Sequence, residues 1–433
     1  MAKFLGVDTG GTFTDFILFD DKSKLTRIHK VLSTPHAAEK AILQGIADLG
    51  IDTNNLIIIH GSTVATNAVL EGKGVRTVYI TNKGLADVLT IGRQAREELY
   101  NLTPIKKPPL IEPDLCLEVN SRLSAQGEHL QQPGEQDLSE LTEQLEALAP
   151  EAVAINLLFS FFDESEELKI EQAIPEGIFI SRSSDVLPEY KEFERGMTTT
   201  LNAKVGPLMQ GYLHRLKDKL HNCSLSIMQS SGGTTSAEQA GSYPVNLLLS
   251  GPAGGLKGAQ TVAGASGVSQ LLSFDMGGTS TDVSIIDKEI GFTTGAKIGG
   301  YPVAVPMVDM HTIGAGGGSI AQVDAGGLLL VGPESAGADP GPACYGKGGK
   351  RPTVTDANVA LGRLLPQFFL GGNMPLDKAA AITAVQIIAD NLSTDEKPMS
   401  VEQAAQGIID VVNDHMVRAL RVMSVERGED PKD

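Results

Sequence analysis

Two short segments rich in aspartate, glycine and threonine carry the residues best suited to chemistry. The first runs from Asp8 to Asp15 and reads D-T-G-G-T-F-T-D, and the second runs from Asp275 to Asp282 and reads D-M-G-G-T-S-T-D. Glycine pairs let backbone N–H groups approach an anion without a Cβ in the way, and threonine hydroxyls can donate to the same oxygens. Carboxylates at strand ends can hold Mg²⁺ through its waters, because this ion sheds water reluctantly. Both segments therefore predict a phosphate site with its metal.

The roles can be assigned residue by residue. Asp8 and Asp275 are the predicted catalytic carboxylates, and they also hold the predicted Mg²⁺. The predicted phosphate-binding residues are the glycines and threonines of the two segments, namely Gly10, Gly11, Thr12, Thr14, Gly277, Gly278, Thr279 and Thr281. A plain hairpin with a glycine turn is the alternative for a single segment. Two matched copies favour ligand binding.

Two further segments are expected to face the same ligand. His60 follows the apolar run 56–59, and the carboxyl end of a strand in an α/β sheet faces the ligand crevice. We therefore take His60 as a candidate catalytic residue, with a hydrogen-bonded structural histidine as the alternative. The glycine run that contains Gly316 and Gly317 predicts a loop in close contact with the ligand.

A second metal site is a weaker hypothesis. Asp309 and His311 are two residues apart, so on a strand they would share one face. They are candidate ligands for a second divalent metal, although no C-x-x-C or H-E-x-x-H spacing supports them. The alternative is a pair of side chains that lines the cleft without metal.

The elements that must position these residues alternate between strands and helices. Each aspartate–glycine segment lies between two apolar runs, which predicts a β-hairpin in both places. Buried strands are predicted at 56–59, 77–80, 153–158 and 178–180, with amphipathic helices between them, and a helix at 189–219 is predicted to break near Pro207. This alternation indicates an α/β fold with parallel sheet. The repeated hairpin predicts two related lobes, 1–190 and 191–433.

Composition limits the partners and the compartment. The 433 residues carry 35 Lys and Arg against 53 Asp and Glu, and the net charge of -18 argues against a nucleic-acid partner. The three cysteines are widely separated, so neither a disulfide framework nor a zinc ribbon is expected. The first residues enter a strand-like run without a signal peptide, and no apolar run approaches ~18 residues. We expect a soluble, cytoplasmic protein with no membrane partner.

Six motifs, taken in order along almost the whole chain, resemble one family. They lie at 8–15, 60–67, 250–255, 274–282, 311–319 and 337–346. The two hairpins resemble the phosphate motifs of the sugar kinase/Hsp70/actin superfamily, and the full series resembles the hydantoinase A/5-oxoprolinase/acetone carboxylase β-subunit family. The resemblance implies two ribonuclease H-like α/β lobes with a nucleotide cleft between them, and it implies ATP and Mg²⁺ as cofactors.

The resemblance also implies an activity. The leading expectation is ATP-dependent ring opening of a small cyclic amide, of the hydantoin, N-methylhydantoin or 5-oxoproline type, by phosphorylation of its carbonyl. The alternatives are a subunit of an ATP-dependent ketone carboxylase and a non-catalytic nucleotide-binding subunit. Family members usually continue past the position of Asp433, so the second lobe is expected to be incomplete at its C-terminus. They usually act with a hydantoinase B-type subunit, which predicts a hetero-oligomer.

Overall fold

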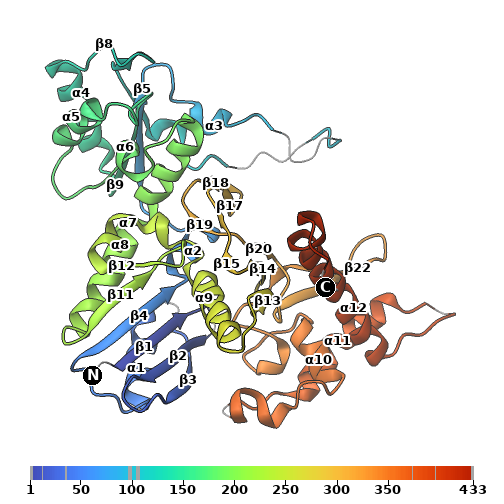
Figure 1. Ribbon diagram of the computed structural model, residues 1–433. Helices are drawn as coiled ribbons and strands as arrows, with labels where there is room; N and C mark the ends of the chain where they lie inside the picture. Colours follow the sequence, from blue (N-terminus) through green and yellow to red (C-terminus); the bar gives the residue numbers. More distant parts are fainter. Residues whose placement is uncertain are drawn as a thin grey trace.

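Three bodies of structure are visible in the computed structural model (Figure 1). It describes residues 3–11, 13–34, 37–95, 100–103, 108–372, 374–394 and 396–430. Within these residues, the core domain takes 3–75 and 192–265, the inserted domain takes 76–190, and the C-terminal domain takes 268–430. The inserted domain stands above the other two in Figure 1, which lie side by side.

A six-stranded mixed sheet forms the centre of the core domain, in the order β12-β11-β4-β1-β2-β3. The strands are β1 (Lys3–Thr9), β2 (Phe13–Asp20), β3 (Thr26–Leu32), β4 (Leu56–Ser62), β11 (Ser224–Met228) and β12 (Thr234–Ser236). β1 pairs antiparallel with β2 and parallel with β4, which also pairs parallel with β11. The domain is therefore built from two distant parts of the sequence.

Alternation along the strands gives this sheet one apolar face. Leu5 and Val7 of β1 and Phe16 and Leu18 of β2 are buried in one hydrophobic core with side chains of α1 (Ala38–Asp48) and α7 (Glu192–Lys219). Burying side chains of this size contributes about 1.5–3 kcal/mol each. A one-residue slip in register would expose all four, so the burial fixes which strand residues point the other way. The shorter helices α2 (Val64–Leu70) and α8 (Ala237–Ser242) complete the domain.

The inserted domain has its own parallel sheet, in the order β10-β9-β5-β6. Its strands are β5 (Thr77–Asn82), β6 (Cys116–Val119), β9 (Ala152–Asn156) and β10 (Phe179–Arg182), and its helices are α3 (Val88–Ile91), α4 (Glu135–Leu148), α5 (Ser165–Ala173) and α6 (Ser183–Val186). The small hairpin of β7 (Arg122–Leu123) and β8 (His129–Gln131) lies beside them. The strands predicted in this region are confirmed, and α4 is one of the helices predicted between them.

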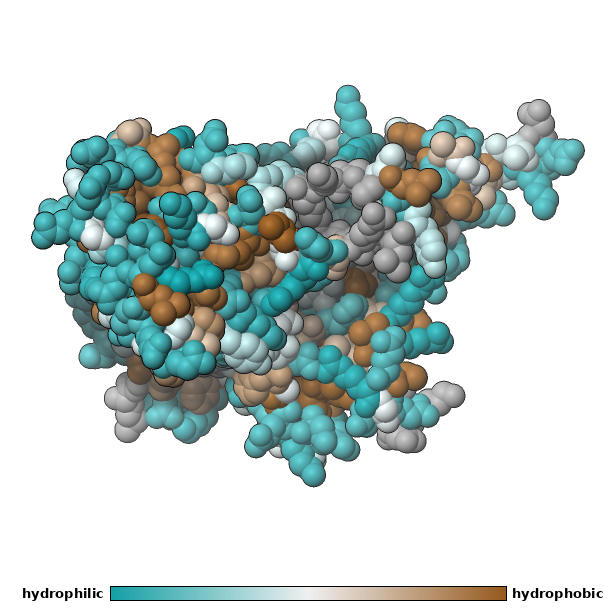
Figure 2. Space-filling view, turned by 90° about the horizontal axis from the view of Figure 1, so that it is seen from above, coloured by the Kyte–Doolittle hydropathy of each residue, from teal (hydrophilic) through white to brown (hydrophobic). Residues whose placement is uncertain are grey.

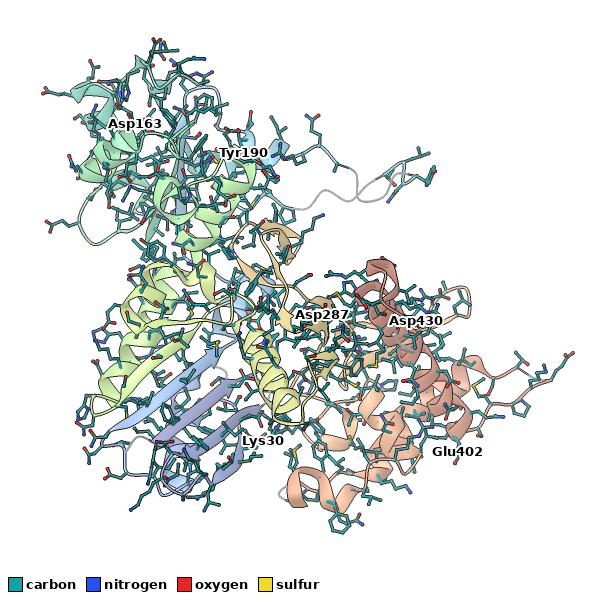
Figure 3. All side chains as sticks on the ribbon, viewed as in Figure 1. Lys30, Asp163, Tyr190, Asp287, Glu402 and Asp430 are labelled. Atoms are coloured by element: carbon teal, nitrogen blue, oxygen red, sulfur yellow. The ribbon has the colours of Figure 1, made fainter. Side chains whose placement is uncertain are left out.

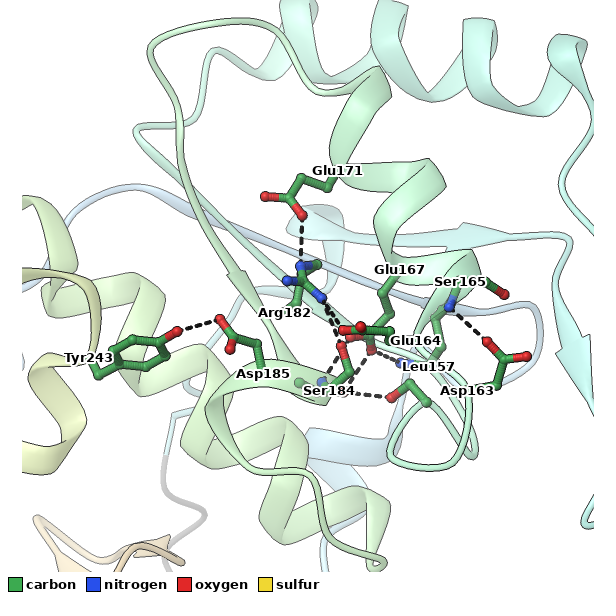
Figure 4. A network of polar contacts seen from close by, with 12 residues as sticks. Leu157, Asp163, Glu164, Ser165, Glu167, Glu171, Arg182, Ser184, Asp185 and Tyr243 are labelled. Carbon is green, nitrogen blue, oxygen red and sulfur yellow. Dashed lines mark hydrogen bonds and ion pairs between the residues drawn. The ribbon is translucent and has the colours of Figure 1, made fainter. Parts of the chain in front are cut away.

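A polar network within the inserted domain reaches the core domain through one hydrogen bond (Figure 4). The buried carboxylate of Glu167 accepts hydrogen bonds from Leu157 N at 2.9 Å and from Ser184 N at 2.9 Å. At the domain boundary, the Tyr243 hydroxyl donates to Asp185 Oδ2 at 2.7 Å. Because a buried charge is costly unless it is hydrogen-bonded, the Glu167 contacts favour one arrangement of the chain inside the inserted domain, and the Tyr243–Asp185 bond links that domain to the core domain.

Helix α7 connects the two domains without a break. It runs from Glu192 to Lys219 and contains Pro207, so the predicted interruption at this proline is wrong. A proline inside a helix costs about 3 kcal/mol. Tertiary packing offsets this cost, because α7 packs against β9, β10 and α8, and most of its first half is buried. Near its start, the fully buried Arg195 donates from Nε to Asn156 Oδ1 at 2.9 Å.

Helix α9 (Ser250–Ala265) leads from the core domain into the C-terminal domain. It lies between the six-stranded sheet and the hairpin of β13 (Gln270–Met276) and β14 (Thr281–Asp287), and it contacts both (Figure 1). β14 also pairs with β15 (Glu289–Ile290) and β20 (His311–Ile313). The remaining strands form two-stranded ribbons: β16 (Phe292–Thr293) with β19 (Met307–Val308), β17 (Ala296–Ile298) with β18 (Tyr301–Val303), and β21 (Ser319–Val323) with β22 (Leu329–Ser335).

Three helices form the core of the C-terminal domain, α10 (Val354–Ala360), α11 (Lys378–Leu392) and α12 (Val401–Met423). The predicted division at 190/191 does not coincide with the sheets, because β11 and β12 follow residue 191 but belong to the first sheet. The face shown in Figure 2 is mainly hydrophilic, with hydrophobic residues in separate patches. Among the described residues, no helix has the length and apolar character needed to cross a membrane.

Candidate active site

The two aspartate–glycine segments form matching hairpins, as predicted. β1 and β2 pair Asp8 with Asp15, and β13 and β14 pair Asp275 with Asp282. Residues directly opposite each other in an antiparallel pair point to the same face. Each hairpin therefore presents two neighbouring carboxylates on one face of its sheet, close to the glycine turn.

The same hydrogen bond closes both turns. Gly10 N donates to Phe13 O at 3.0 Å, and Gly277 N donates to Ser280 O at 2.8 Å. The N–H groups that follow in the second turn, those of Gly278 and Thr279, have no hydrogen-bond partner among the described residues. Both residues are exposed. They are donors that a phosphate oxygen could accept from.

The Asp8 carboxylate lies in a space that two glycines leave open. A Cβ at Gly61 would be 3.3 Å from Asp8 Oδ1, and one at Gly251 would be 3.1 Å from the same atom. Gly61 is the residue of β4 opposite Asp8, and Gly251 is in the first turn of α9. The positive end of the α9 dipole thus lies beside this carboxylate.

Loss of solvation, and then repulsion between carboxylates, raises the pKa of an aspartate on each hairpin. Crowding by protein atoms, followed by the charges of Asp15 and Asp275, raises the pKa of Asp8 to about 6, and Lys30 opposes the shift. Crowding and Asp275 also raise the pKa of Asp282, against a hydrogen bond from Thr312. Because Asp275 affects carboxylates on both hairpins, the two turns are within electrostatic reach of each other.

Helix α9 separates two cavities that contain these carboxylates. One, of about 320 Å³, is lined by Asp8 and Asp15, and the other, of about 230 Å³, is lined by Asp275 and Asp282. Gly255 of α9 lines both. A larger hollow of about 760 Å³ lies between the inserted and core domains, but none of the predicted site residues lines it.

The carboxylates fit a hydrated magnesium ion. Neighbouring carboxylates are stabilised when a divalent cation binds between them. Among the described residues, no group of three or more His, Cys, Asp or Glu side chains is placed to hold a metal ion directly. Mg²⁺ usually keeps several of its waters, and a hydrated ion at Asp8 and Asp275 stays a prediction.

The threonines of the two turns require a correction. Ser33 Oγ donates its hydrogen to Gly10 O at 2.7 Å, so Thr14 must be the donor in its 2.9 Å contact with Ser33. Thr281 donates to Ala315 O at 2.6 Å. Both threonines are fully buried. Since a hydroxyl has one hydrogen, Thr14 and Thr281 support the turns and have none left for phosphate.

The structure supports some of the remaining predicted phosphate-binding residues and not others. Thr12 lies outside the described residues. Gly11 and Thr279 are exposed, as a ligand-binding role needs. The predicted phosphate contacts of Gly316 and Gly317 are revised, because both backbone N–H groups already have partners. The Gly316 N–H donates to Ser319 Oγ, and the Gly317 N–H donates to Gly277 O at 3.0 Å. Their loop lies behind the second hairpin and supports it.

The predicted catalytic role of His60 is also revised. Its imidazole is fully buried, with Nε2 2.7 Å from the Tyr212 hydroxyl and Nδ1 3.4 Å from Val7 O. The side chain lies on the core face of the sheet, opposite the face that carries Asp8. The structure favours the alternative of a structural histidine, because a side chain in this position cannot reach a substrate.

Burial of His60 predicts a pH-dependent loss of stability. Burial lowers the pKa of His60 from 6.5 to about 4. As the pH falls from 6.5 to 4, the unfolded chain binds this proton before the folded chain does, so folding loses about 3 kcal/mol. We expect His60→Gln to lack this component. The measurement is the difference in urea unfolding free energy between the wild type and the variant at pH 7 and pH 4.5, and equal pH dependence would contradict the prediction.

The second-metal candidates lie beside α12. Arg427, just after this helix, makes a bidentate ion pair with the Asp309 carboxylate. His311 lines a separate cavity of about 470 Å³ together with His415 and Arg418. The guanidinium already occupies the oxygens of Asp309, which counts against metal binding there.

Sequence reasoning missed several residues of this site. Asp15 and Asp282 were not among the predicted site residues, although they occupy equivalent positions at the ends of the two segments. Gly251 was not predicted as a site residue either, although it lies in the motif at 250–255. Position in the repeat was a usable signal for the two aspartates, whereas the contact of Gly251 with Asp8 comes only from the tertiary fold.

Comparisons with known proteins agree on one family. Residues 195–433 match the family model described as hydantoinase/oxoprolinase, and residues 4–178 match the model of the hydantoinase/oxoprolinase N-terminal region. The chain is 36% identical to caprolactamase subunit alpha of Pseudomonas jessenii over 99% of its own length, and 33% identical to 5-oxoprolinase 1 of Arabidopsis thaliana over 98%. It spans 64% and 37% of these two relatives.

Solved structures show the same likeness. A nucleotide-free structure of acetone carboxylase, from work on ATP-dependent acetone carboxylation, superposes with a TM-score of 0.85 at 27% identity. The ATP-dependent caprolactamase of Pseudomonas jessenii gives 0.81 at 36% identity. Each match covers 99% of this chain and 64% of the other. The α/β fold with parallel sheets is thus similar to both enzymes.

Proposed function

Because the chain belongs to the hydantoinase/oxoprolinase family, we propose that it is the ATP-using part of an enzyme that opens a small cyclic amide. The observation that carries the proposal is the pair of matching hairpins on either side of α9, each with two paired aspartates close to its glycine turn. Relatives named for hydrolysis of cyclic amides, caprolactamase and 5-oxoprolinase, support the reaction class. The chain spans about two thirds or less of these relatives, so its activity remains a proposal.

We further infer that the core and C-terminal domains are the two lobes of a sugar kinase/Hsp70/actin-type fold. The repeated hairpin supports this inference, as does the position of α9 between the two domains. In this arrangement the cavities beside Asp8 and Asp275 are parts of one nucleotide cleft. The exposed N–H groups of Gly278 and Thr279 would donate to phosphate oxygens.

The proposed reaction couples ATP cleavage to ring opening. The amide oxygen of the ring takes the γ-phosphoryl group of ATP, the bond to the β–γ bridging oxygen breaks, and ADP leaves. Water then adds to the activated carbon, and the ring C–N bond breaks as nitrogen gains a proton, which leaves an acyl phosphate. A second water hydrolyses this acyl phosphate to the carboxylate and free phosphate. One ATP and two waters are consumed for each ring. Mg²⁺, when bound, neutralises phosphate charge, and the chain orients the reactants and excludes water.

An ATP-dependent ketone carboxylase subunit is the second candidate, and the likeness to acetone carboxylase favours it. Both reactions begin with activation of a carbonyl oxygen, so the nucleotide site does not separate them. We propose for either reaction a second, hydantoinase B-type subunit, since a subunit name among the relatives indicates a complex. A non-catalytic nucleotide-binding role and a cytoplasmic location stay predictions, as does a metal at Asp309 and His311.

The test is phosphate release in the presence of candidate substrates. The chain is assayed alone and with its complementary subunit, using caprolactam, hydantoin, N-methylhydantoin and 5-oxoproline, and acetone with bicarbonate for the carboxylase. We expect phosphate and ring-opened product in equal amounts with one cyclic amide, and only when the second subunit is present. Carboxylated product would select the second candidate. MgATP binding without turnover under every condition would leave a nucleotide-binding role alone.

A further inference from the structure

A cross-strand row of side chains in the core domain ends in a lysine. On neighbouring strands, Gly61 is opposite Asp8, Asp8 is opposite Asp15, and Asp15 is opposite Lys30. Directly opposed residues share a face, so the row crosses β4, β1, β2 and β3 on the face that carries the site. Lys30 Nζ is 2.9 Å from Asp15 Oδ1 and 5.2 Å from the centre of the Phe13 ring.

The equivalent row in the C-terminal domain ends without a charge. Asp275 is opposite Asp282, and Asp282 is opposite Thr312 on β20. The Thr312 hydroxyl donates to Asp282 Oδ1 at 2.5 Å. The repeat is thus preserved through both aspartates and differs at the third strand, where the core domain has a cation and the C-terminal domain has a neutral donor.

This difference affects the electrostatics of the site. Asp15 and Asp275 raise the pKa of Asp8, and the positive charge of Lys30 opposes them. Figure 3 shows Lys30 on the edge of the core sheet that faces the C-terminal domain. In the proposed nucleotide cleft, the polyphosphate chain of ATP would lie near carboxylates of both hairpins, and each uncompensated carboxylate opposes its binding.

A contribution to folding stability does not by itself explain the ion pair of Lys30 with Asp15. Lys30 and Asp15 are each about half exposed, and exposed ion pairs contribute only about 0–1 kcal/mol to folding. A second lysine–aspartate pair of this kind, Lys24 with Asp21 at 2.6 Å, lies in the loop between β2 and β3 and far along the hairpin from the glycine turn. The two pairs are alike in chemistry and differ in their distance from the site.

We propose that Lys30 is a positioning residue of the nucleotide site, which holds the Asp15 carboxylate and cancels its charge so that the phosphates of ATP can bind beside Asp8. This inference rests on the proposed nucleotide-binding function. It assigns to Lys30 an effect on nucleotide affinity that acts through Asp15, with little effect on the chemical step.

The experiment compares Lys30→Met with Lys30→Arg. MgATP binding is measured by calorimetry, and KM for ATP and kcat are measured in the assembled enzyme. We expect Lys30→Met to weaken MgATP binding and raise KM about tenfold, with kcat within about twofold and an unchanged melting temperature. Lys30→Arg should retain near wild-type affinity. Adding Asp15→Asn to Lys30→Met should restore most of the lost affinity, because the uncompensated charge is then absent.

Lys24→Met is the matched control, since it removes the same charge from the same hairpin and should leave MgATP binding unchanged. Wild-type affinity in Lys30→Met would overturn the inference, as would a double variant that binds no better than Lys30→Met. Loss of affinity in Lys24→Met would also overturn it, because net charge would then explain the effect. A wild-type chain that binds no MgATP would refute the proposed function and this inference together.

Discussion

Asp8→Asn and Asp275→Asn are each expected to reduce ATP turnover by about a thousandfold while the protein stays folded. Asparagine keeps the size of the side chain and removes the charge that would hold hydrated Mg²⁺. Because Asp275 and Asp15 repel Asp8, removing the Asp8 charge also relieves repulsion. The Asp8→Asn variant should therefore melt at the same temperature as the wild type or higher. The measurements are magnesium-dependent phosphate release and thermal unfolding.

Asp287→Asn is the control for these variants. Asp287 lies at the far end of β14 from the glycine turn, where it is exposed (Figure 3). The control should retain full turnover. Unchanged turnover in both Asp8→Asn and Asp275→Asn would remove the hairpins from the active site, and a large fall in melting temperature would show that the charges are structural.

Gly316→Ala is expected to displace the glycine turn of the second hairpin, because the loop that contains Gly316 packs against that turn. A Cβ at this position would be 2.7 Å from Gly277 O and 2.9 Å from Thr279 N, distances that real Cβ contacts do not reach. The loop and the turn must move apart, at a cost of about 1–3 kcal/mol. A shift of this kind at a phosphate-binding turn is expected to lower turnover about a hundredfold, because positioning carries much of phosphoryl transfer. Phosphate release and urea unfolding test both effects.

The control for Gly316→Ala is a glycine with free space around it. Gly264 is in the last turn of α9, and no atom lies within 4 Å of a Cβ placed there. Gly264→Ala should keep turnover and gain up to about 1 kcal/mol of stability, since alanine favours the helix. Full activity in Gly316→Ala would show that the loop does not support the turn.

The hairpins could be predicted because their information is local and repeated. Strand, glycine turn and strand occur twice with six identical positions, and pairing of β1 with β2 and of β13 with β14 follows directly. The roles of Thr14 and Thr281 could not be predicted in this way. Their partners, Ser33 and Ala315, come from other segments, and only the tertiary fold shows that the hydroxyls are already used.

His60 and Pro207 are two further residues whose local sequence signal did not predict the structure. His60 lies within β4 rather than after it, and alternation along this strand turns its side chain to the helix-covered face. Pro207 carries a strong local signal against helix, yet the packing of α7 against two sheets outweighs it. In both cases the sequence signal was real, and a tertiary contact decided the outcome.

The split construction of the core sheet has a consequence during synthesis. β4 pairs with β11, and about 160 residues separate Ser62 from Ser224. At translation rates of about 5–20 residues per second, the partner strand emerges roughly 10–30 s after β4. During this interval the ribosome-bound chain exposes the Leu56–Ser62 edge, an apolar segment with unpaired backbone groups. The inserted domain, with its own sheet and core, can fold in the meantime, which makes the nascent N-terminal strands a natural client for chaperones.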